Sequence, residues 1–320
     1  MRAGRNGGDR AEEPVRRPRL GWSAWARTLA GLAVLGVVVW WYPLEAFTDA
    51  ATAVDARAAL AALGIGAATT VLSAARWRTV ARGVGLRLPL RRAVADYYLA
   101  VFLNSVLPAG ILGDVHRAFG HGRSSGDMGR GVRAVVLERT AGQVVLAACG
   151  AALLFALPAA LPGPGLRAAG VTFGVLAALA LVCAVALRVG GARRPRWWRS
   201  LRRAEADVRA GLLARWPSVL LFSVAALAGY VTLFLLASHL AGVTAPVLRL
   251  VPPAILALLV MSLPLSLGGW GPREAVTALA FGVAGMGSQT GLTVSVVYGL
   301  LALVSSLPGA VVLVIRRVRG

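Results

Sequence analysis

The sequence predicts an all-α integral membrane protein with about six full transmembrane helices and two re-entrant hairpins broken by proline and glycine, arranged as an inverted repeat. Three observations predict this class. The chain of 320 residues is 58% hydrophobic and only 15% charged, and its mean hydropathy is +0.71. Several apolar runs approach the roughly 20 residues that a helix needs to cross a bilayer. Two further apolar segments are interrupted by proline and glycine and resemble each other.

The charge of the chain comes from arginine. The formal net charge is +21, and because the sequence has no lysine, all 34 basic residues are arginines. Most lie in short stretches between apolar runs, where cytoplasmic loops of membrane proteins collect arginine. We therefore interpret the charge as a topology signal and expect no nucleic-acid partner. Cys149 and Cys183 lie inside apolar runs, so we expect no disulfide and no metal site, and no cofactor is expected.

The long apolar runs define the expected organisation of the chain. Residues 1–25 are polar and rich in arginine, which predicts a disordered cytoplasmic arm. Residues 26–320 are expected to form a single transmembrane domain, whose repeat halves cover about 57–157 and 217–315. The full spans are expected at residues 26–44, 57–75, 134–157, 166–188, 217–240 and 289–315.

The arginines also orient the spans. Both flanks of residues 93–113 are basic, so this segment is expected to begin and end at the cytoplasmic face without crossing the membrane. Residues 251–286 lie between a span that exits and a final span that returns to Arg316 and Arg317. This second segment is therefore expected to enter and leave from the opposite face. Both termini are expected in the cytoplasm, and the protein is expected in the plasma membrane.

Proline and glycine explain how a chain can turn at membrane depth. Proline removes a backbone donor, and irregular backbone is tolerated there where it is buried in protein or lines a cavity. An alternative interpretation is that the glycines allow close helix packing. The expected turn residues are Pro108, Gly110 and Gly113 in the first segment, and Pro264, Gly268, Gly269 and Gly271 in the second.

The two interrupted segments carry similar motifs, LPAGILGDVHR at residues 107–117 and LPLSLGGWGPR at residues 263–273. In each motif an arginine follows the proline by nine positions, and an acidic residue, Asp114 or Glu274, accompanies it. Because the topology points the two units in opposite directions, we expect an inverted repeat. In transporters of this kind, broken segments at corresponding positions mark the substrate site.

Charged residues near these breaks are the candidates for function. A charge at membrane depth costs several kcal/mol unless it is paired or hydrated. Arginine binds phosphate through two parallel hydrogen bonds, and backbone N–H groups at a helix break can also face an anion. The expected substrate-binding residues are Arg117, Arg273, Asp114, Glu274, Glu138, Arg139 and Asn104.

Three of these residues have simpler interpretations. Arg117 is alternatively a solvated loop arginine that marks the cytoplasmic face. Arg139 is as readily explained by a side chain that extends to the membrane interface as by contact with a ligand. Glu138 is alternatively a carboxylate that only neutralises a neighbouring arginine.

Three stretches resemble a known family: RWRTVARGVGLRLPLRRAVADYYLAVFLNSVLPAGILGDVHR, LERTAGQ and SLPLSLGGWGPREA. Together they are similar to the transmembrane region of lysylphosphatidylglycerol synthase, a flippase-like family, over about residues 20–315. The resemblance implies movement of lipids or lipid-linked head groups between leaflets. Bifunctional members carry a soluble aminoacyltransferase domain after this region, and the sequence here ends at Gly320, so we expect translocation without synthesis.

The expected function is therefore translocation of a lipid or lipid-linked head group that carries phosphate. The expected partners are membrane lipids, either phospholipids or polyprenyl-phosphate-linked lipids, and a lipid-synthesising enzyme is a further candidate partner. The alternative is an intramembrane lipid-modifying enzyme, or a subunit of one, in which paired acids perform acid–base catalysis. Because the sequence offers no nucleophile–base set, metal cluster or nucleotide-binding motif, no enzymatic activity is expected. The lipid, the direction, the energy coupling and the oligomeric state stay open.

Overall fold

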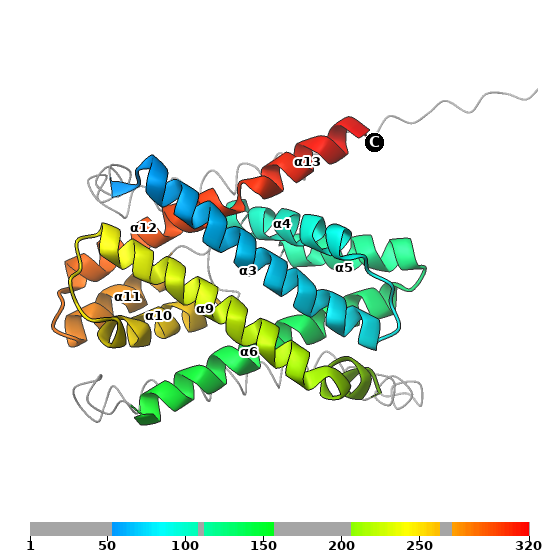
Figure 1. Cartoon of the computed structure of the whole chain (residues 1–320), viewed down its shortest axis with the longest axis horizontal. Helices are drawn as coiled ribbons and strands as arrows, with labels where there is room; N and C mark the ends of the chain where they lie inside the picture. Colours follow the sequence, from blue (N-terminus) through cyan, green and yellow to red (C-terminus); the bar gives the residue numbers. More distant parts are fainter. Residues whose placement is uncertain (1–52, 108–111, 157–205, 263–270, 320) are drawn as a thin grey trace, which may run out of the picture.

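The computed structural model describes residues 53–107, 112–156, 206–262 and 271–319, and the regular elements in these ranges are helices (Figure 1). Four helices in the described ranges are long and apolar enough to cross a membrane. They correspond to four of the six predicted full spans, which supports an all-α membrane protein. The other two predicted spans, 26–44 and 166–188, and the predicted arm lie outside the described residues.

The four long helices follow the apolar runs of the sequence but differ from the predicted spans at their ends. They are α3 (Ala56–Gly83), α6 (Met128–Ala156), α9 (Trp216–Leu240) and α12 (Ser288–Ser306). The predicted end of the first at residue 75 and the predicted start of the second at residue 134 are wrong, because both helices continue through arginine-rich sequence. Arginine is a good helix former, so its charge places a membrane boundary without ending the helix.

Recognisable residues mark the start of α3 and the end of α12. Asp55 accepts a hydrogen bond of 2.7 Å from the backbone N–H of Ala58, which satisfies a donor at the start of α3. The predicted span 289–315 is divided after α12, where Pro308 begins a further helix, α13 (Pro308–Arg319). This last helix packs on α4 (Leu90–Val106), and Arg316 donates a 2.6 Å hydrogen bond to Asp96.

The first interrupted segment forms two antiparallel helices, α4 and α5 (Leu112–Ser125). Gly113 at the start of α5 lies directly against the backbone of Ala100 in α4, and a Cβ atom there would overlap with the Ala100 carbonyl. At the other end of the pair, His121 lies within electrostatic range of Arg92. The alternative interpretation of close packing therefore describes Gly113, which lies inside a helix. Pro108 and Gly110 lie outside the described residues.

The second interrupted segment also forms two packed helices, α10 (Val247–Met261) and α11 (Pro272–Val283). Figure 1 shows that α9 leads to the end of the bundle where α10 begins, and that α11 returns to this end before α12 starts. Gly271 precedes α11 with φ +102°, a conformation that glycine adopts at no steric cost. The other predicted turn residues, Pro264, Gly268 and Gly269, lie outside the described residues.

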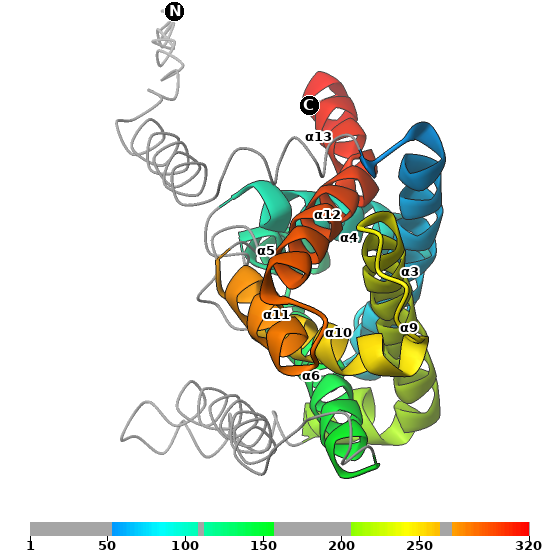
Figure 2. The same ribbon diagram turned by 90° about the vertical axis from the view of Figure 1, so that its left-hand side faces the viewer.

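Helices α3 and α9 lie side by side at one side of the molecule (Figure 2) and run antiparallel (Figure 1). Arg76 donates a 3.1 Å hydrogen bond to Ser223, and Thr69, which precedes Arg76 on α3, lies against Gly229, which follows Ser223 on α9. The following contacts among α3–α6 and α9–α12 occur in matching pairs, in which α3, α4, α5 and α6 correspond to α9, α10, α11 and α12. The pairs are α3–α4 with α9–α10, α4–α5 with α10–α11, α5–α6 with α11–α12, α3–α6 with α9–α12, α3–α12 with α9–α6, and α4–α12 with α10–α6.

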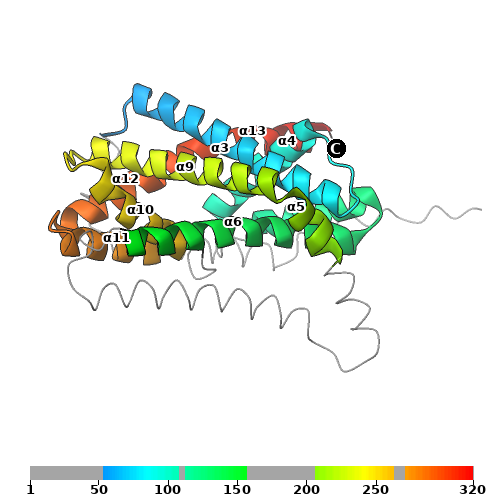
Figure 3. The same ribbon diagram turned by 60° about the horizontal axis from the view of Figure 1, so that its bottom comes forward.

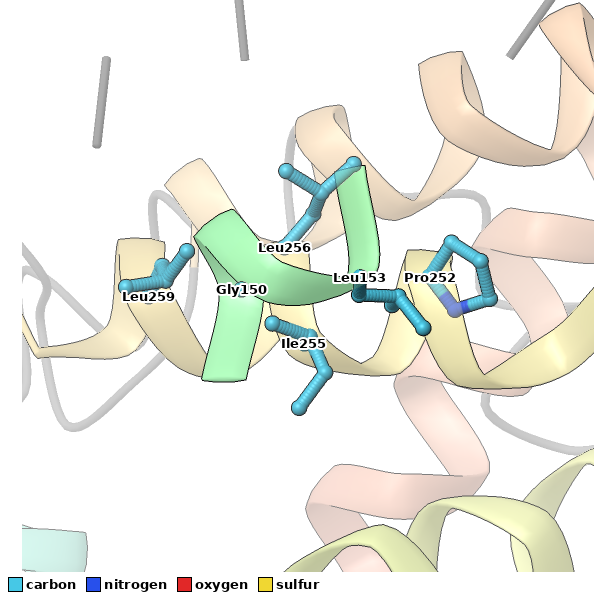
Figure 4. A pocket seen from close by; sticks show the side chains of 6 residues that line it. All are labelled: Gly150, Leu153, Pro252, Ile255, Leu256 and Leu259. Atoms are coloured by element: carbon cyan, nitrogen blue, oxygen red, sulfur yellow. The ribbon is translucent and has the colours of Figure 1, made fainter. Parts of the chain in front are cut away.

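The matched helices form two sets, α3–α6 and α9–α12, and a cluster of buried apolar side chains is centred in each set. In one set Phe234 of α9 packs against Phe281 and Tyr298, with ring centroids 6.5 and 5.8 Å apart. In the other set Trp77 is the largest fully buried side chain. Helix α6 runs along the bundle beside α10 (Figure 3), and a small pocket lies between them (Figure 4). This pocket is lined by Gly150, Leu153, Pro252, Ile255, Leu256 and Leu259, which offer no charged group to a ligand.

Arginines gather at one end of the bundle, which we call the arginine-rich end. It is formed by the end of α3, the start of α4, the end of α5 and the starts of α6 and α9 (Figure 1). Consequently the two basic flanks of the first interrupted segment lie at the same end. The exposed arginines there are Arg82, Arg87, Arg91, Arg92, Arg123, Arg130 and Arg215.

Candidate functional site

Glu138 is the centre of a buried group of charges. One carboxylate oxygen accepts hydrogen bonds from Arg76 of α3, at 3.0 Å from Nε and 2.5 Å from Nη2. The other oxygen accepts a 2.5 Å bond from Nη2 of Arg117 in α5. Glu138 follows the first residue of α6 by ten positions, which places it about 15 Å along the helix axis. The predicted span begins at residue 134, so Glu138 lies about 6 Å past the predicted membrane boundary.

Arg117 is fully buried in α5, so the interpretation of Arg117 as a solvated loop residue is wrong. Its Nε donates a 2.9 Å hydrogen bond to Asp114, one turn earlier. Its guanidinium carbon lies 4.8 Å from the ring centroid of Trp77 and 4.5 Å from that of Tyr97. Arg117 therefore joins two carboxylates and two aromatic rings, and a planar guanidinium is suited to both kinds of contact.

Arg139 and Asp114 form the accessible side of the same group. Arg139 donates to Asp114 through Nη2, and its side chain remains 41% exposed while that of Asp114 is 16% exposed. Asn104 of α4 donates a 3.2 Å bond to Asp114 and accepts a 2.8 Å bond from the backbone N–H of Gly113. Asn104 thereby fixes the start of α5 against α4.

The partners of Glu138 are not its neighbours in the sequence. Glu138 pairs with Arg76 and Arg117, which belong to other helices.

The charges of this group, which we call the Glu138 cluster, do not cancel. It contains the guanidinium groups of Arg76, Arg117 and Arg139 and the carboxylates of Asp114 and Glu138, so three positive and two negative charges give +1. Such an excess at membrane depth is costly unless an anion or water compensates it.

The Glu138 cluster also carries donors with no acceptor among the described residues. They are the buried atoms Nη1 of Arg117, Nε of Arg139 and Nε1 of Trp77. Arginine and tryptophan side chains donate hydrogen bonds and accept none. A buried donor that lacks an acceptor costs free energy. Arg117 and Trp77 are fully buried, so a group that brings negative charge and oxygen acceptors, such as a phosphate, reaches the cluster at Arg139.

A second group surrounds Arg273 in α11, and we call it the Arg273 cluster. Arg273 and Glu274 are both fully buried and paired with each other. Arg273 also donates a 2.9 Å bond to Ser295 of α12, and its guanidinium carbon lies 5.4 Å from the ring centroid of Tyr298. Glu274 accepts a 2.6 Å bond from the backbone N–H of Gly271, which stabilises the start of α11. Arg273 and Glu274 together carry no net charge.

Helix α9 connects the two clusters. Ser223 accepts from Arg76 of the Glu138 cluster, and Phe234 packs on Tyr298 of the Arg273 cluster. These two positions on α9 are eleven residues apart, or about 16 Å along the axis. The two motif arginines thus belong to separate clusters on one shared helix.

The sequence missed several members of these clusters. Arg76 and Trp77 come directly after the predicted span 57–75, but α3 continues beyond both and the two side chains are buried. A signal was present, because Thr69, Ser73 and Arg76 form a polar stripe at helical spacing. Ser295 and Tyr298 gave no such signal. Within the described residues no group of side chains is suited to a metal ion.

Comparison with known proteins identifies the family of the chain. A family model described as "Lysylphosphatidylglycerol synthase TM region" matches residues 28–309. Neither a search of curated proteins nor a search of solved structures gives a match. Because the matched region covers most of the sequence, including both interrupted segments, the chain belongs to the lysylphosphatidylglycerol synthase transmembrane-region family.

Proposed function

We propose that the protein moves a lipid with an anionic, phosphate-bearing head group between the leaflets of the plasma membrane. The observation that carries this proposal is the Glu138 cluster, which combines a net charge of +1 with buried donors that lack an acceptor among the described residues. It lies partly on α3 and α6, two helices that are long and apolar enough to cross a membrane. A soluble ligand has no need of a charged site between such helices, whereas a head group that crosses the membrane must pass them. Membership of a family that is linked to lipid metabolism or transport supports the same conclusion.

The arrangement in the membrane follows from the matched helix contacts. We infer that α3–α6 and α9–α12 are inverted repeats about an axis in the membrane plane, because their counterparts α3 and α9 run antiparallel. The pairs α4–α5 and α10–α11 are then re-entrant hairpins that enter from opposite faces. The arginine-rich end is cytoplasmic, because arginine accumulates on that side of membrane proteins. Both termini then lie in the cytoplasm.

The side chains have different roles in this proposal. Arg139 contacts the phosphate, since its guanidinium is the accessible one in the Glu138 cluster. Arg117 and Glu138 hold Arg139 and Asp114 in place without touching the lipid, because both are fully buried. Asp114 and Asn104 line the same accessible surface. Acyl chains remain in the surrounding lipid throughout.

A reconstitution experiment tests the proposal. Purified protein is placed in liposomes that contain a fluorescent phosphatidylglycerol, and an impermeant reductant reports how much label reaches the outer leaflet. We expect the native protein to exchange the label and Arg139→Ala to slow the exchange at least about tenfold, because a charge-assisted hydrogen bond is lost.

Arg130→Ala is the matched control, since Arg130 is an exposed arginine of the same helix that pairs with Asp127 at the surface. Its exchange rate should equal that of the native protein. Native protein that exchanges no lipid would overturn the proposal, as would equal rates for Arg139→Ala and Arg130→Ala. Mass spectrometry of the recovered lipid distinguishes transport from the alternative of a lipid-modifying enzyme, which would leave a chemically altered lipid.

A further inference from the structure

Tyr230 of α9 lies between the two clusters and keeps 37% of its surface exposed. It follows Ser223 by seven positions and precedes Phe234 by four, so the three side chains share one face of the helix. Tyr230 lies within electrostatic range of Arg76 and Arg139 on one side and of Tyr298 on the other. It is a hydroxyl group on the helix that connects both clusters.

Arg139 and Tyr230 share an unusual combination of properties. Each lies among side chains of several helices, and each nevertheless keeps more than a third of its surface accessible. Arg139 projects from α6 and Tyr230 from α9, two helices that share less contact than their counterparts α12 and α3. The accessible parts of Arg139 and Tyr230 therefore belong to two helices that are in contact with each other.

We propose that the Arg139 guanidinium and the Tyr230 hydroxyl form the two sides of one binding position for a lipid phosphodiester. This inference rests on the proposed function and adds a specificity-determining residue to it. The hydroxyl donates a hydrogen bond to a phosphate oxygen without adding charge. The guanidinium supplies the charge and a second donor to the same phosphate.

The charge balance of the Glu138 cluster determines which phosphate fits. Three guanidinium groups and two carboxylates leave one positive charge, and a phosphodiester brings one negative charge. A phosphomonoester carries up to two negative charges at neutral or higher pH. It leaves one negative charge uncompensated at membrane depth, where an unpaired charge is unfavourable. The position therefore selects a phosphodiester over a phosphomonoester or a diphosphate.

The contribution of the hydroxyl is tested with Tyr230→Phe, which removes one oxygen and keeps the ring. The rate of transbilayer exchange of fluorescent phosphatidylglycerol should fall at least about fivefold, because a hydrogen bond to a charged group is lost. Thr232→Val is the matched control, since it removes an exposed hydroxyl from the same helix and its hydroxyl bonds only to the backbone of Ala228. Its rate should stay within about twofold of the native rate.

Selectivity provides a second test that does not depend on Tyr230→Phe folding. The native protein at pH 8 should exchange phosphatidylglycerol faster than acyl-labelled phosphatidic acid, which is a phosphomonoester. Asp114→Asn raises the charge of the cluster from +1 to +2, and it should shift the preference toward phosphatidic acid. An unchanged preference in Asp114→Asn, or a native rate in Tyr230→Phe, would contradict this inference while leaving lipid translocation itself intact. If the native protein moves neither lipid, the proposed function fails with it.

Discussion

The guanidinium of Arg117 makes contacts both at its edge and on its faces. Its edge binds Asp114 and Glu138, and its faces lie over Trp77 and Tyr97. A lysine ammonium would keep the charge, but it has no planar fork to hold both carboxylates and no face to stack between the rings. Arg273 is bound in a similar way, because it pairs with Glu274, donates to Ser295 and lies over the ring of Tyr298.

We therefore expect Arg117→Lys and Arg273→Lys each to lower both the thermal stability in detergent and the rate of lipid exchange. Arg123→Lys on the exposed surface of α5 is the control and should change neither quantity. Native stability and native exchange in both buried variants would reduce these arginines to markers of topology.

The two motif carboxylates provide a matched comparison. Glu274 is fully buried and accepts from Arg273 and from the backbone of Gly271, whereas Asp114 is partly exposed. Glu274→Gln leaves a buried arginine without its counter-charge, for which we expect a loss of roughly 3–5 kcal/mol in stability. Asp114→Asn should cost clearly less, because water reaches its side chain. The unfolding temperatures of the two purified variants measure the difference, and equal values would contradict it.

At this scale the sequence predicted the cluster centres and missed their surroundings. Arg117, Asp114, Glu138 and Arg139 stand out because charge is rare in an apolar region. Arg76 was overlooked because an arginine at the end of an apolar run has the same appearance as a loop arginine. What distinguishes the two is a partner 62 positions away, Glu138, and pairing over such a separation has no local signature.

Among the helices, the contact of α4 with α5 is the one that depends most clearly on a single residue. Gly113 meets the backbone of Ala100, while Gly120 on the same helix has no neighbouring atom within 4 Å of a Cβ position. Gly113→Ala must push the two helices apart, and overpacking of this kind costs about 1–3 kcal/mol. Gly120→Ala should be neutral or stabilising by up to about 1 kcal/mol, since alanine favours helix more than glycine does.

Thermal unfolding of both alanine variants checks this expectation, together with lipid exchange. Gly113→Ala should also slow exchange, because the displacement of α5 moves Asp114 and Arg117. If Gly113→Ala is as stable and active as Gly120→Ala, α4 and α5 do not approach each other as closely as the structure indicates.

The lengths of the helices show where sequence reasoning succeeds. The predicted span 217–240 agrees closely with α9, whose apolar run is bounded by Pro217 and by the positive-φ Gly242. The end of α3 was predicted too early, because charge marks the edge of the hydrocarbon region and not the end of hydrogen bonding. In the sequence, Pro108 and Gly110 fall between α4 and α5, and Pro264, Gly268 and Gly269 fall between α10 and α11, but they do not determine how the flanking helices pack.

The topology of the whole molecule is open to a labelling experiment. In a protein whose native cysteines are replaced by serine, single cysteines are introduced as Arg92→Cys, Arg123→Cys and Leu248→Cys. The first two positions lie at the arginine-rich end and the third is exposed near the opposite end, at the start of α10. An impermeant maleimide added to sealed vesicles should therefore modify the first two from one side and the third from the other. Modification of positions 92 and 123 from opposite sides would exclude a re-entrant first hairpin.

The unequal charge of the two clusters has a thermodynamic consequence. The Glu138 cluster carries +1 and the pair of Arg273 and Glu274 carries none, so an anion dwells longer at the first. In a carrier without an energy source, the strength of a binding site changes how long the lipid stays bound there. By detailed balance, it does not change the equilibrium ratio of the lipid between the two leaflets. Only a quantity that differs between the two sides changes that ratio, and a membrane potential is one. A potential of 100 mV acts on one elementary charge with about 2.3 kcal/mol, or roughly a 50-fold ratio. With the cytoplasm negative, a lipid that crosses with one negative charge collects in the outer leaflet, however differently the two clusters bind it.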